Sequence, residues 1–331
     1  MKIILKESAA PEQVRALTEV LRTRGFTVTQ TSAGTALLLS EDCPKPDAEL
    51  LLREACVLAV EQVSEPPLLT SRAARAEDTC VRVGTARLGG GSFALIAGPC
   101  AVESEEQLLS VARAVKAAGA ELLRGGAFKP RTSPYEFQGL GREGVRLLEL
   151  ARRETGLPVV TEIVDPRELE LLEQMDMLQV GARNMQNFSL LKELGRCKKP
   201  VLLKRGMGCT LRELLLSAEY LLSAGNGQVV LCERGIRSFD DAVRNTLDLS
   251  AVPLLHELSH LPVIVDPCHA VGRARLVPPM ALAAAACGAD GVMLEVHGDP
   301  LRAQCDASQA LLPEEFAALT AKLRTLRETL K

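Results

Sequence analysis

The chain has 331 residues, 47% of them hydrophobic, so it can bury a full core and is not expected to be disordered. Its 39 basic and 42 acidic side chains leave a net charge of −3, which argues against broad attraction to nucleic acid or to an anionic membrane surface. No apolar stretch approaches the roughly twenty residues of a membrane helix, and the N-terminus lacks a signal-peptide core, so a cytoplasmic protein is expected.

Residues 1–70 predict a small ferredoxin-like α+β domain, because their strands and helices follow the order βαββαβ. Pro11 suits the first turn of a helix and Gly25 suits the position after its end. Residues 71–91 are expected to form a linker and a short hairpin. The predicted strands are 2–5, 27–31, 35–39 and 57–62, the predicted helices are 11–24 and 47–55, and the predicted hairpin strands are 80–83 and 86–88.

Residues 92–331 alternate short apolar runs with helical segments, which predicts a (β/α)₈ TIM barrel. The runs are continuously apolar, as expected for parallel strands buried on both faces. A doubly wound open sheet is the structural alternative. No dinucleotide fingerprint supports that alternative, because GGGSFALIAG precedes a strand instead of following one. The eight predicted strands begin near residues 93, 120, 158, 177, 200, 228, 262 and 290.

Four potential metal ligands lie far apart in the chain, each at or just beyond the end of a predicted strand or in the loop after one: Cys100, His269, Glu295 and Asp306. Because parallel barrel strands bring their carboxyl ends together, these residues are expected to converge there. Taken singly, each has an ordinary structural explanation as a buried thiol, a hydrogen-bonded histidine or an ion-paired carboxylate. Together, a thiolate, an imidazole and two carboxylates suit Zn²⁺, Fe²⁺, Mn²⁺ or Co²⁺ better than Mg²⁺ or Ca²⁺ alone. Such an ion would act as a Lewis acid on a carbonyl group.

Many cationic side chains also follow the predicted strands. Their charges would repel one another unless anionic substrates neutralised them, and arginine geometry suits phosphate and carboxylate groups. The sequence therefore predicts substrates with several negative charges. By contrast, His256 and His260 are expected to be surface or packing residues. The rim cations are Arg124, Lys129, Arg131, Arg183, Lys204, Arg205 and Arg234.

Seven ordered motifs carry a resemblance to a known enzyme family over about residues 80–320. The sequence closely resembles 3-deoxy-D-arabino-heptulosonate 7-phosphate (DAHP) synthases of the type Iβ group, some of which carry a ferredoxin-like regulatory domain. The motifs are AGPCAVES at 97, RGGAFKPRTSPYEFQGLG at 124, GARNMQN at 181, LLKRGM at 202, ERGIRSF at 233, VDPCHAVG at 265 and MLEVH at 293.

The resemblance implies a function and a set of roles. Enzymes of this family are transferases that join phosphoenolpyruvate to erythrose 4-phosphate, with release of phosphate, at the entry to the shikimate route to aromatic amino acids. Lys129, His269 and Cys100 would be catalytic, with Lys129 a candidate proton donor near the aldehyde oxygen. A homotetramer or dimer is the family expectation. Phosphoenolpyruvate would contact Arg124, Arg183, Lys204 and Arg234; erythrose 4-phosphate would contact Lys129, Pro130, Arg131 and Thr132; and the metal would be held by Cys100, His269, Glu295 and Asp306.

Three positions depart from the family pattern. The usual DPSH reads DPCH at Cys268, EVHP reads EVHG at Gly298, and SDG reads CDA at 305–307. None of these changes removes a ligand. Two additional thiols beside ligand positions suggest that, without metal, Cys100 could oxidise with Cys268 or Cys305 and inactivate the enzyme.

Two other functions are compatible with a barrel of this kind. The related 3-deoxy-octulosonate 8-phosphate synthases use arabinose 5-phosphate, but their usual KANRSS-like segment reads KPRTS here, at 129–133. A catalytically inactive barrel that binds a phosphorylated ligand is the second alternative. The N-terminal domain could bind an aromatic amino acid, with residues 29–34 as the contact region, or it could serve folding or oligomer formation. The sequence fixes neither the physiological metal nor the effector.

Overall fold

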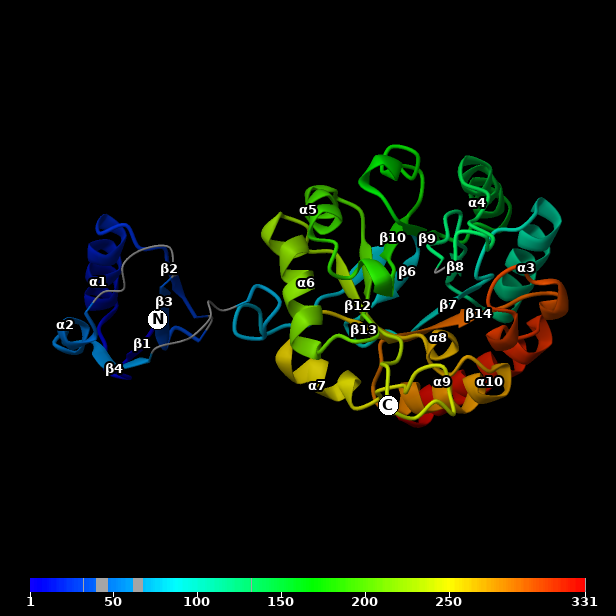
Figure 1. The fold of residues 1–331 in the computed structure, drawn as a ribbon. Helices are drawn as coiled ribbons and strands as arrows, with labels where there is room; N and C mark the ends of the chain where they lie inside the picture. The colour runs from blue at the N-terminus through cyan, green and yellow to red at the C-terminus, as the bar shows by residue number, and fades with distance from the viewer. Residues whose placement is uncertain (32, 40–46, 62–67, 132, 331) are drawn as a thin grey trace. The chain divides into compact units, whose positions relative to one another are not determined.

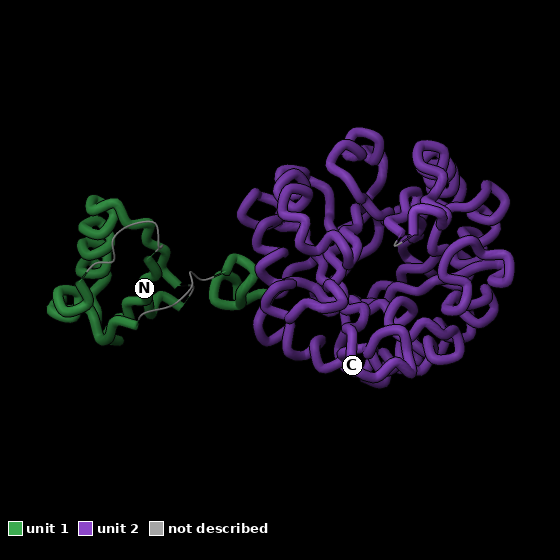
Figure 2. Tube along the Cα trace, in the orientation of Figure 1, with its two compact units in different colours: residues 1–77 green, residues 78–331 purple. Residues whose placement is uncertain are grey.

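The computed structural model describes residues 1–331 except 32, 40–46, 62–67, 132 and 331. The chain forms two compact units, Met1–Glu77 and Asp78–Lys331 (Figure 2). The division falls inside the connection predicted at 71–91. Among the helices of the described residues, none is long and apolar enough to span a membrane.

The N-terminal unit is a four-stranded antiparallel sheet of order β2-β3-β1-β4 with two helices. Its strands and helices follow the predicted order βαββαβ. Helix α1 begins with Pro11 and packs through Leu17 and Leu21, which lie one helical turn apart and are buried. The strands are β1 (Lys2–Leu5), β2 (Val28–Gln30), β3 (Ala36–Leu39) and β4 (Val57–Glu61), and the helices are α1 (Pro11–Thr23) and α2 (Ala48–Leu52).

The second unit is a closed barrel of eight parallel strands, in the order β10-β11-β12-β13-β14-β7-β8-β9. Each predicted apolar run contains one of these strands. The open-sheet alternative is wrong, because β14 pairs with β7 and closes the ring from Gly291 against Ala94 to Glu295 against Gly98. The strands are β7 (Ala94–Gly98), β8 (Leu122–Arg124), β9 (Val159–Ile163), β10 (Met177–Val180), β11 (Val201–Lys204), β12 (Val229–Glu233), β13 (Val263–Val265) and β14 (Gly291–Glu295).

Helices lie around the ring of strands and cover its outer face (Figure 1). The amphipathic helix α4, for example, buries Val145, Leu148 and Ala151, which recur at three-residue spacing. The helices are α3 (Glu105–Ala118), α4 (Arg142–Thr155), α5 (Phe188–Arg196), α6 (Leu211–Ser223), α7 (Ala251–Leu258), α8 (Pro267–Val271), α9 (Val277–Ala286) and α10 (Pro313–Thr329), with 3₁₀ turns η1 (Pro166–Glu168), η2 (Ala182–Asn184), η3 (Ala274–Leu276), η4 (Pro300–Arg302) and η5 (Ala307–Gln309).

The predicted hairpin, β5 (Val81–Val83) and β6 (Ala86–Leu88), covers the amino end of the barrel. Its four apolar side chains join the same buried cluster as Ile96, Leu122 and Met293 from the barrel interior. Glycine positions in and after the hairpin lie against Pro158 and Pro262, which precede β9 and β13. One end of the barrel is thus filled with apolar side chains, and the carboxyl ends of the strands remain available for polar groups.

Gly98 provides a test of barrel closure. Its φ is +152°, and a Cβ there would lie 2.1 Å from the carbonyl oxygen of Arg124. We expect Gly98→Ala to lower the free energy of unfolding by about 2 to 3 kcal/mol, because backbone must move to admit the methyl group. Urea denaturation measures this change. Gly227→Ala is the matched control, since Gly227 has no neighbour within 4 Å and no positive φ; equal midpoints for the two variants would contradict the account.

Candidate metal and substrate site

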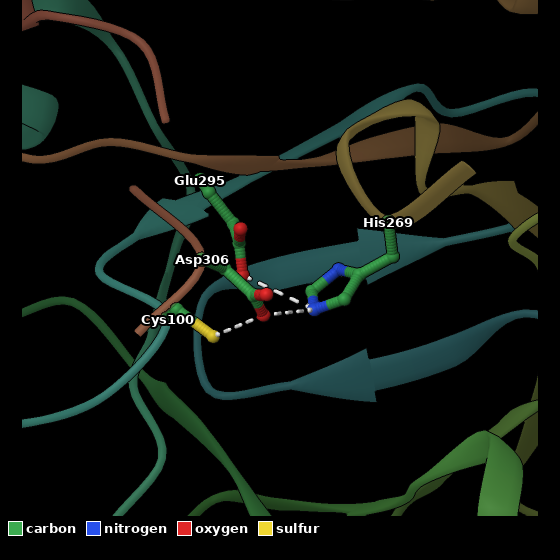
Figure 3. A group of neighbouring side chains, drawn as sticks. All are labelled: Cys100, His269, Glu295 and Asp306. Carbon is green, nitrogen blue, oxygen red and sulfur yellow. Dashed lines mark hydrogen bonds and ion pairs between the residues drawn. The ribbon is translucent and has the colours of Figure 1, made fainter. Parts of the chain in front are cut away.

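The four predicted metal ligands lie together at the carboxyl ends of the barrel strands (Figure 3). Cys100 follows β7, His269 belongs to α8 after β13, Glu295 is the last residue of β14, and Asp306 precedes η5. Their ligand atoms all lie within 4.8 Å of one another. The convergence predicted from the strand ends is therefore present in the structure.

The contacts within this group connect all four side chains. Nε2 of His269 lies 3.2 Å from Oε1 of Glu295 and 3.5 Å from Oδ2 of Asp306. Sγ of Cys100 lies 3.2 Å from the same Oδ2. One sulfur, one imidazole nitrogen and carboxylate oxygens therefore face a common point, and this donor set suits a first-row transition metal ion or Zn²⁺.

Asp306 is held in an unusual backbone conformation. It has a φ of +53° and is the one non-glycine with positive φ among the described residues. Its other carboxylate oxygen accepts a hydrogen bond of 3.0 Å from Nη1 of Arg244. Burial would raise the pKa of Asp306, but His269 and Arg244 hold it far below its usual range. The side chain is therefore an ionised carboxylate directed at the other three ligands, and local strain of this kind clusters at functional sites.

Asp266, directly after β13, joins the metal-ligand group to Lys204, the last residue of β11. Its Oδ2 accepts a hydrogen bond from Nζ of Lys204 and lies 2.7 Å from Nδ1 of His269, while its Oδ1 accepts from the backbone N–H of His269 at 3.0 Å. Burial would raise the pKa of Asp266, but His269 and Lys204 hold it well below its usual range. With Nδ1 engaged by a carboxylate, Nε2 is left to face Glu295 and Asp306, which is the arrangement of metal-bound histidines.

The imidazole of His269 is strongly affected by these carboxylates. Burial would lower the pKa of His269, but Asp266 and Glu295 raise it to about 10. In the protein alone the ring is therefore an imidazolium that balances negative charge. A divalent cation at Nε2 would take over that balancing role, because metal ligation uses the neutral ring.

Arg124 pairs with a metal-ligand residue. Its Nη1 donates to Oε1 of Glu295 at 2.9 Å, and both side chains are buried. Gln309 donates to the other oxygen of Glu295 at 2.6 Å. Arg124 lies outside the lining of the main pocket and borders a smaller cavity beside it. The contact of this cation with Glu295 was not predicted, because the pairing joins residues 171 positions apart.

A pocket of 290 Å³ opens beside the metal-ligand group. Besides His269, seven lysine and arginine side chains line it against three carboxylates. This excess of positive charge agrees with the prediction of polyanionic substrates. Arg237 and Arg244 belong to this lining and were not among the predicted contacts, although Arg237 lies in the ERGIRSF motif. The lining cations are Lys129, Arg131, Arg183, Lys204, Arg234, Arg237 and Arg244, and the carboxylates are Glu136, Glu162 and Asp306.

Arg234 is the cation that most clearly lacks a protein partner at one of its atoms. The residue is only 5% exposed, and its Nη1 has no hydrogen-bond partner within the described part of the chain. Burial lowers the pKa of Arg234, and the neighbouring charges of Arg244 and Arg183 lower it further. A buried guanidinium with an unsatisfied N–H group is costly unless an anion neutralises it, so this end of the pocket is suited to phosphate or carboxylate.

Residues 129–131, the first part of the KPRTS segment, line this pocket together with two of the metal-ligand residues. Nζ of Lys129 donates to the backbone oxygen of Cys100 at 3.3 Å and lies 3.9 Å from Oε2 of Glu162. Burial would lower the pKa of Lys129, but the charges of Cys100 and Glu162 raise it, so the side chain is an ammonium ion. Pro130 also lines the pocket. The predicted contact Thr132 lies outside the described residues.

Arg131 makes two contacts at the pocket wall. Its Nε donates to Glu136 at 2.8 Å, and its Nη1 lies 2.6 Å from Sγ of Cys305. Arg205, the rim cation that follows Lys204 in the chain, does not face the pocket. It donates to Glu233 and Asp248, each at 2.9 Å, and is absent from the pocket lining. Successive residues of a strand point to opposite sides. Lys204 therefore faces the pocket, whereas Arg205 points away from it and pairs with Glu233 and Asp248.

A closed (β/α)₈ barrel with a metal-ligand group and a strongly cationic pocket at the carboxyl ends of its strands defines a barrel enzyme. The profile of the DAHP synthetase I family matches residues 73–331, and the chain belongs to that family.

Relatives of this chain agree with the assignment. A phospho-2-dehydro-3-deoxyheptonate aldolase of Thermotoga maritima is 48% identical over 276 residues, 83% of this chain and 82% of the relative. A crystal structure of DAHP synthase from Thermotoga maritima has a TM-score of 0.80 at 42% identity, covering 99% of this chain and 97% of the other. A 2-dehydro-3-deoxyphosphooctonate aldolase of Syntrophobacter fumaroxidans is 34% identical and covers 73% of this chain and 91% of that relative, so it is more distant.

Replacement of Asp266 tests the link between the two halves of the site. Asp266→Ala would leave Lys204 and His269 buried without their shared partner, so we expect the free energy of unfolding to fall by about 3 to 5 kcal/mol. Urea denaturation of the metal-free protein measures the loss. Glu143→Ala is the control, because Glu143 pairs with Arg146 on the exposed surface of α4 and should leave the midpoint unchanged. Equal midpoints for both variants would contradict a shared buried carboxylate.

Proposed function

We propose that this enzyme condenses phosphoenolpyruvate with erythrose 4-phosphate and water to give DAHP and inorganic phosphate, the first step of the shikimate route. The observation that carries the proposal is a four-residue metal-ligand group beside a pocket lined by seven lysine and arginine side chains against three carboxylates. Membership of the DAHP synthetase I family supports the same activity. Both substrates are phosphorylated, so their mutual repulsion would be offset by these cations.

The proposed metal ligands are Cys100, His269, Glu295 and Asp306. The mixed donor set supports Mn²⁺, Fe²⁺, Zn²⁺ or Co²⁺, and cellular supply decides among them. When bound, the metal ion would supply Lewis-acid polarisation of the aldehyde oxygen of erythrose 4-phosphate. Asp266 would hold the His269 ring in the orientation needed for ligation, through its 2.7 Å contact with Nδ1.

Arg183, Lys204 and Arg234 are proposed to hold phosphoenolpyruvate. All three line the pocket, and the unpaired Nη1 of Arg234 supports an anion at that point. Arg124 is proposed to contribute from behind this group. Its Nη1 pairs with Glu295 and its Nη2 donates to the backbone oxygen of Cys100 at 3.4 Å, while its Nε has no hydrogen-bond partner among the described atoms and is left for substrate or water.

Lys129, Pro130 and Arg131 are proposed to shape the erythrose 4-phosphate site, with Thr132 completing the segment. Lys129 lies within hydrogen-bond distance of the backbone oxygen of Cys100, and therefore beside the proposed metal site. Its ammonium group is suited to donate a hydrogen bond or a proton to the oxygen that becomes negative when the aldehyde is attacked. Arg131 supplies positive charge at the mouth of the same region.

These positions suggest how the residues act in the reaction. C3 of phosphoenolpyruvate forms a bond to the aldehyde carbon, and Lys129 stabilises the oxyanion that develops there. Water adds to C2 and loses a proton, and a proton neutralises the oxyanion. The C2 hydroxyl then becomes the ketone carbonyl as the C2–O bond to phosphate breaks, and the electron pair and the hydroxyl proton leave with inorganic phosphate. Arg183, Lys204 and Arg234 hold the phosphate and carboxylate groups so that C3 faces the aldehyde, and this positioning lowers the entropic part of the barrier.

The activity is tested by phosphate release from metal-stripped, reduced protein given phosphoenolpyruvate with either erythrose 4-phosphate or arabinose 5-phosphate. We expect Mn²⁺, Zn²⁺ or Fe²⁺ to restore release with erythrose 4-phosphate alone. Release with arabinose 5-phosphate would shift the function to the octulosonate enzymes. No release with any metal would contradict catalysis and favour a binding barrel.

Variants connect this activity to the proposed ligands. We expect His269→Ala to lose its bound metal and to release phosphate more than about 100-fold more slowly than the parent enzyme. Removal of a residue that only supports a metal ligand costs up to about 100-fold, and removal of a ligand should cost more. His256→Ala is the control, because His256 lies on α7 and pairs with Asp290 at 3.5 Å. The metal content of each purified variant is measured by elemental analysis, and its rate of phosphate release is measured in parallel. Full activity and metal content in His269→Ala would overturn the ligand assignment.

We also propose that the N-terminal unit, the predicted domain of residues 1–70, binds an aromatic amino acid that inhibits the barrel, in a cytoplasmic homodimer or homotetramer. A pocket of 650 Å³ in this unit supports the idea, since it combines apolar and charged side chains. It includes part of the predicted contact region 29–34, of which residue 32 lies outside the described chain. Lining residues include Leu5, Lys6, Val14, Arg15, Gln30 and Gly34.

Removal of residues 1–75 tests this regulation. The remaining barrel has its own core, and a truncated DAHP synthase from Thermotoga maritima matches 79% of this chain with a TM-score of 0.74. We expect tyrosine or phenylalanine to inhibit the full chain and to leave the truncated enzyme unaffected, in activity titrations at matched metal content. Equal inhibition of both forms would remove the regulatory role of the unit.

A further inference from the structure

Two thiols lie side by side in the proposed metal site. Sγ of Cys100 is 3.4 Å from Sγ of Cys305, and both residues are buried, at 6% and 5% exposure. Cys305 occupies the position before Asp306 where the family pattern has serine. Together with Ala101 and Phe137, the two cysteines form a small apolar cluster. The proposed reaction assigns no role to the thiol of Cys305.

The local geometry is favourable for joining the two sulfur atoms. A disulfide bond is about 2.05 Å long, so the atoms must approach by about 1.4 Å from their separation of 3.4 Å. Cys100 lies in the loop after β7, and Cys305 lies between η4 and η5. Neither is fixed inside a strand of the barrel, so side-chain rotation and small loop shifts can supply that movement.

The two thiols differ in what surrounds them. Cys305 lines the main pocket, whereas Cys100 does not. Nη1 of Arg131 lies 2.6 Å from Sγ of Cys305. An oxidant that enters the substrate pocket therefore meets Cys305 first.

We propose that Cys305 is an oxidation site and that Cys100 resolves it by forming a reversible disulfide when the metal is absent. The protection by metal rests on the proposed function, in which Cys100 is a ligand; the disulfide itself does not. The structure also chooses between the two partners that the sequence left open. Sγ of Cys268 accepts a hydrogen bond from the backbone N–H of Glu295 at 3.2 Å, is fully buried, and lies outside the pocket lining.

The chemistry balances with a peroxide as the oxidant. The Cys305 sulfur attacks hydrogen peroxide, the O–O bond breaks, and a sulfenic acid and water are formed. The Cys100 sulfur then attacks the sulfur of this sulfenic acid and displaces its oxygen as a second water molecule. Two thiols and one peroxide thus give one disulfide and two waters. A metal ion on Cys100 would block the second step, because the sulfur electron pair that attacks is then bound to the metal.

The consequence is a reversible loss of metal binding. A disulfide removes the one sulfur donor of the ligand group and leaves His269, Glu295 and Asp306. Reduction by a dithiol restores Cys100 and with it the complete donor set. The disulfide form would be inactive and metal-free, and its Cys100 sulfur would be protected from irreversible oxidation.

Peptide mapping of the full chain tests the proposal. Metal-stripped protein is treated with hydrogen peroxide, its free thiols are blocked under denaturing conditions, and the unreduced digest is examined by mass spectrometry while metal uptake is measured in parallel. We expect a peptide linking Cys100 to Cys305, loss of metal uptake, and recovery of both after dithiothreitol. During the peroxide treatment, Cys305→Ser should lose its capacity for metal uptake at least about tenfold more slowly than the parent chain, because the thiol that lines the pocket is gone. Cys268→Ser is the matched control and should behave like the parent.

Two outcomes overturn the proposal: Cys100 recovered as a free thiol after metal uptake is lost, or Cys100 linked to a cysteine other than Cys305. A metal-loaded arm keeps this test separate from the proposed function. Slower formation of the linked peptide in protein with one equivalent of bound Mn²⁺ supports protection. The linked peptide formed equally in both arms, with no metal bound in either, would preserve the disulfide and remove the proposed metal site.

Discussion

The site depends on one buried carboxylate that two cations share. Asp266 is fully buried directly after β13, and it contacts both Lys204 from β11 and His269 from α8. Without it, a lysine and an imidazole would carry positive charge in a barrel interior that has little water to solvate them. Because the same carboxylate fixes the ring orientation of His269 and the position of Lys204, the proposed metal ligand and the proposed substrate cation cannot move independently.

A second constraint is the balance of charge around the pocket. Some rim cations are neutralised by protein carboxylates, as Arg124 is by Glu295 and Arg205 is by Glu233 and Asp248. Arg234, in contrast, keeps a buried N–H group that has no hydrogen-bond partner among the described residues. The rim cations therefore differ in how far protein carboxylates neutralise them. A site for two phosphorylated substrates requires the positive charge that remains, since each protein ion pair formed removes charge that substrates would otherwise meet.

The sequence predicted the architecture well because the relevant signals are local. Continuous apolar runs mark strands buried on both faces, and the residue that follows each run must lie at the rim. This reasoning was sufficient to bring Cys100, His269, Glu295 and Asp306 to one end of the barrel. The direction of each rim side chain was not predictable, because it depends on neighbours far away in sequence. The pairing of Arg124 with Glu295, the left-handed backbone of Asp306 and the contact of Arg131 with Cys305 all belong to this class.

The central claim is that four side chains bind one metal ion and that Cys100 supplies its sulfur. The most direct test is the absorption spectrum of the reduced, metal-stripped chain titrated with Co²⁺. The account predicts a thiolate-to-cobalt charge-transfer band that saturates at one equivalent, persists in Cys305→Ser and is lost in Cys100→Ser. A band that is unchanged in Cys100→Ser, or cobalt binding without any such band in the parent chain, would contradict the account.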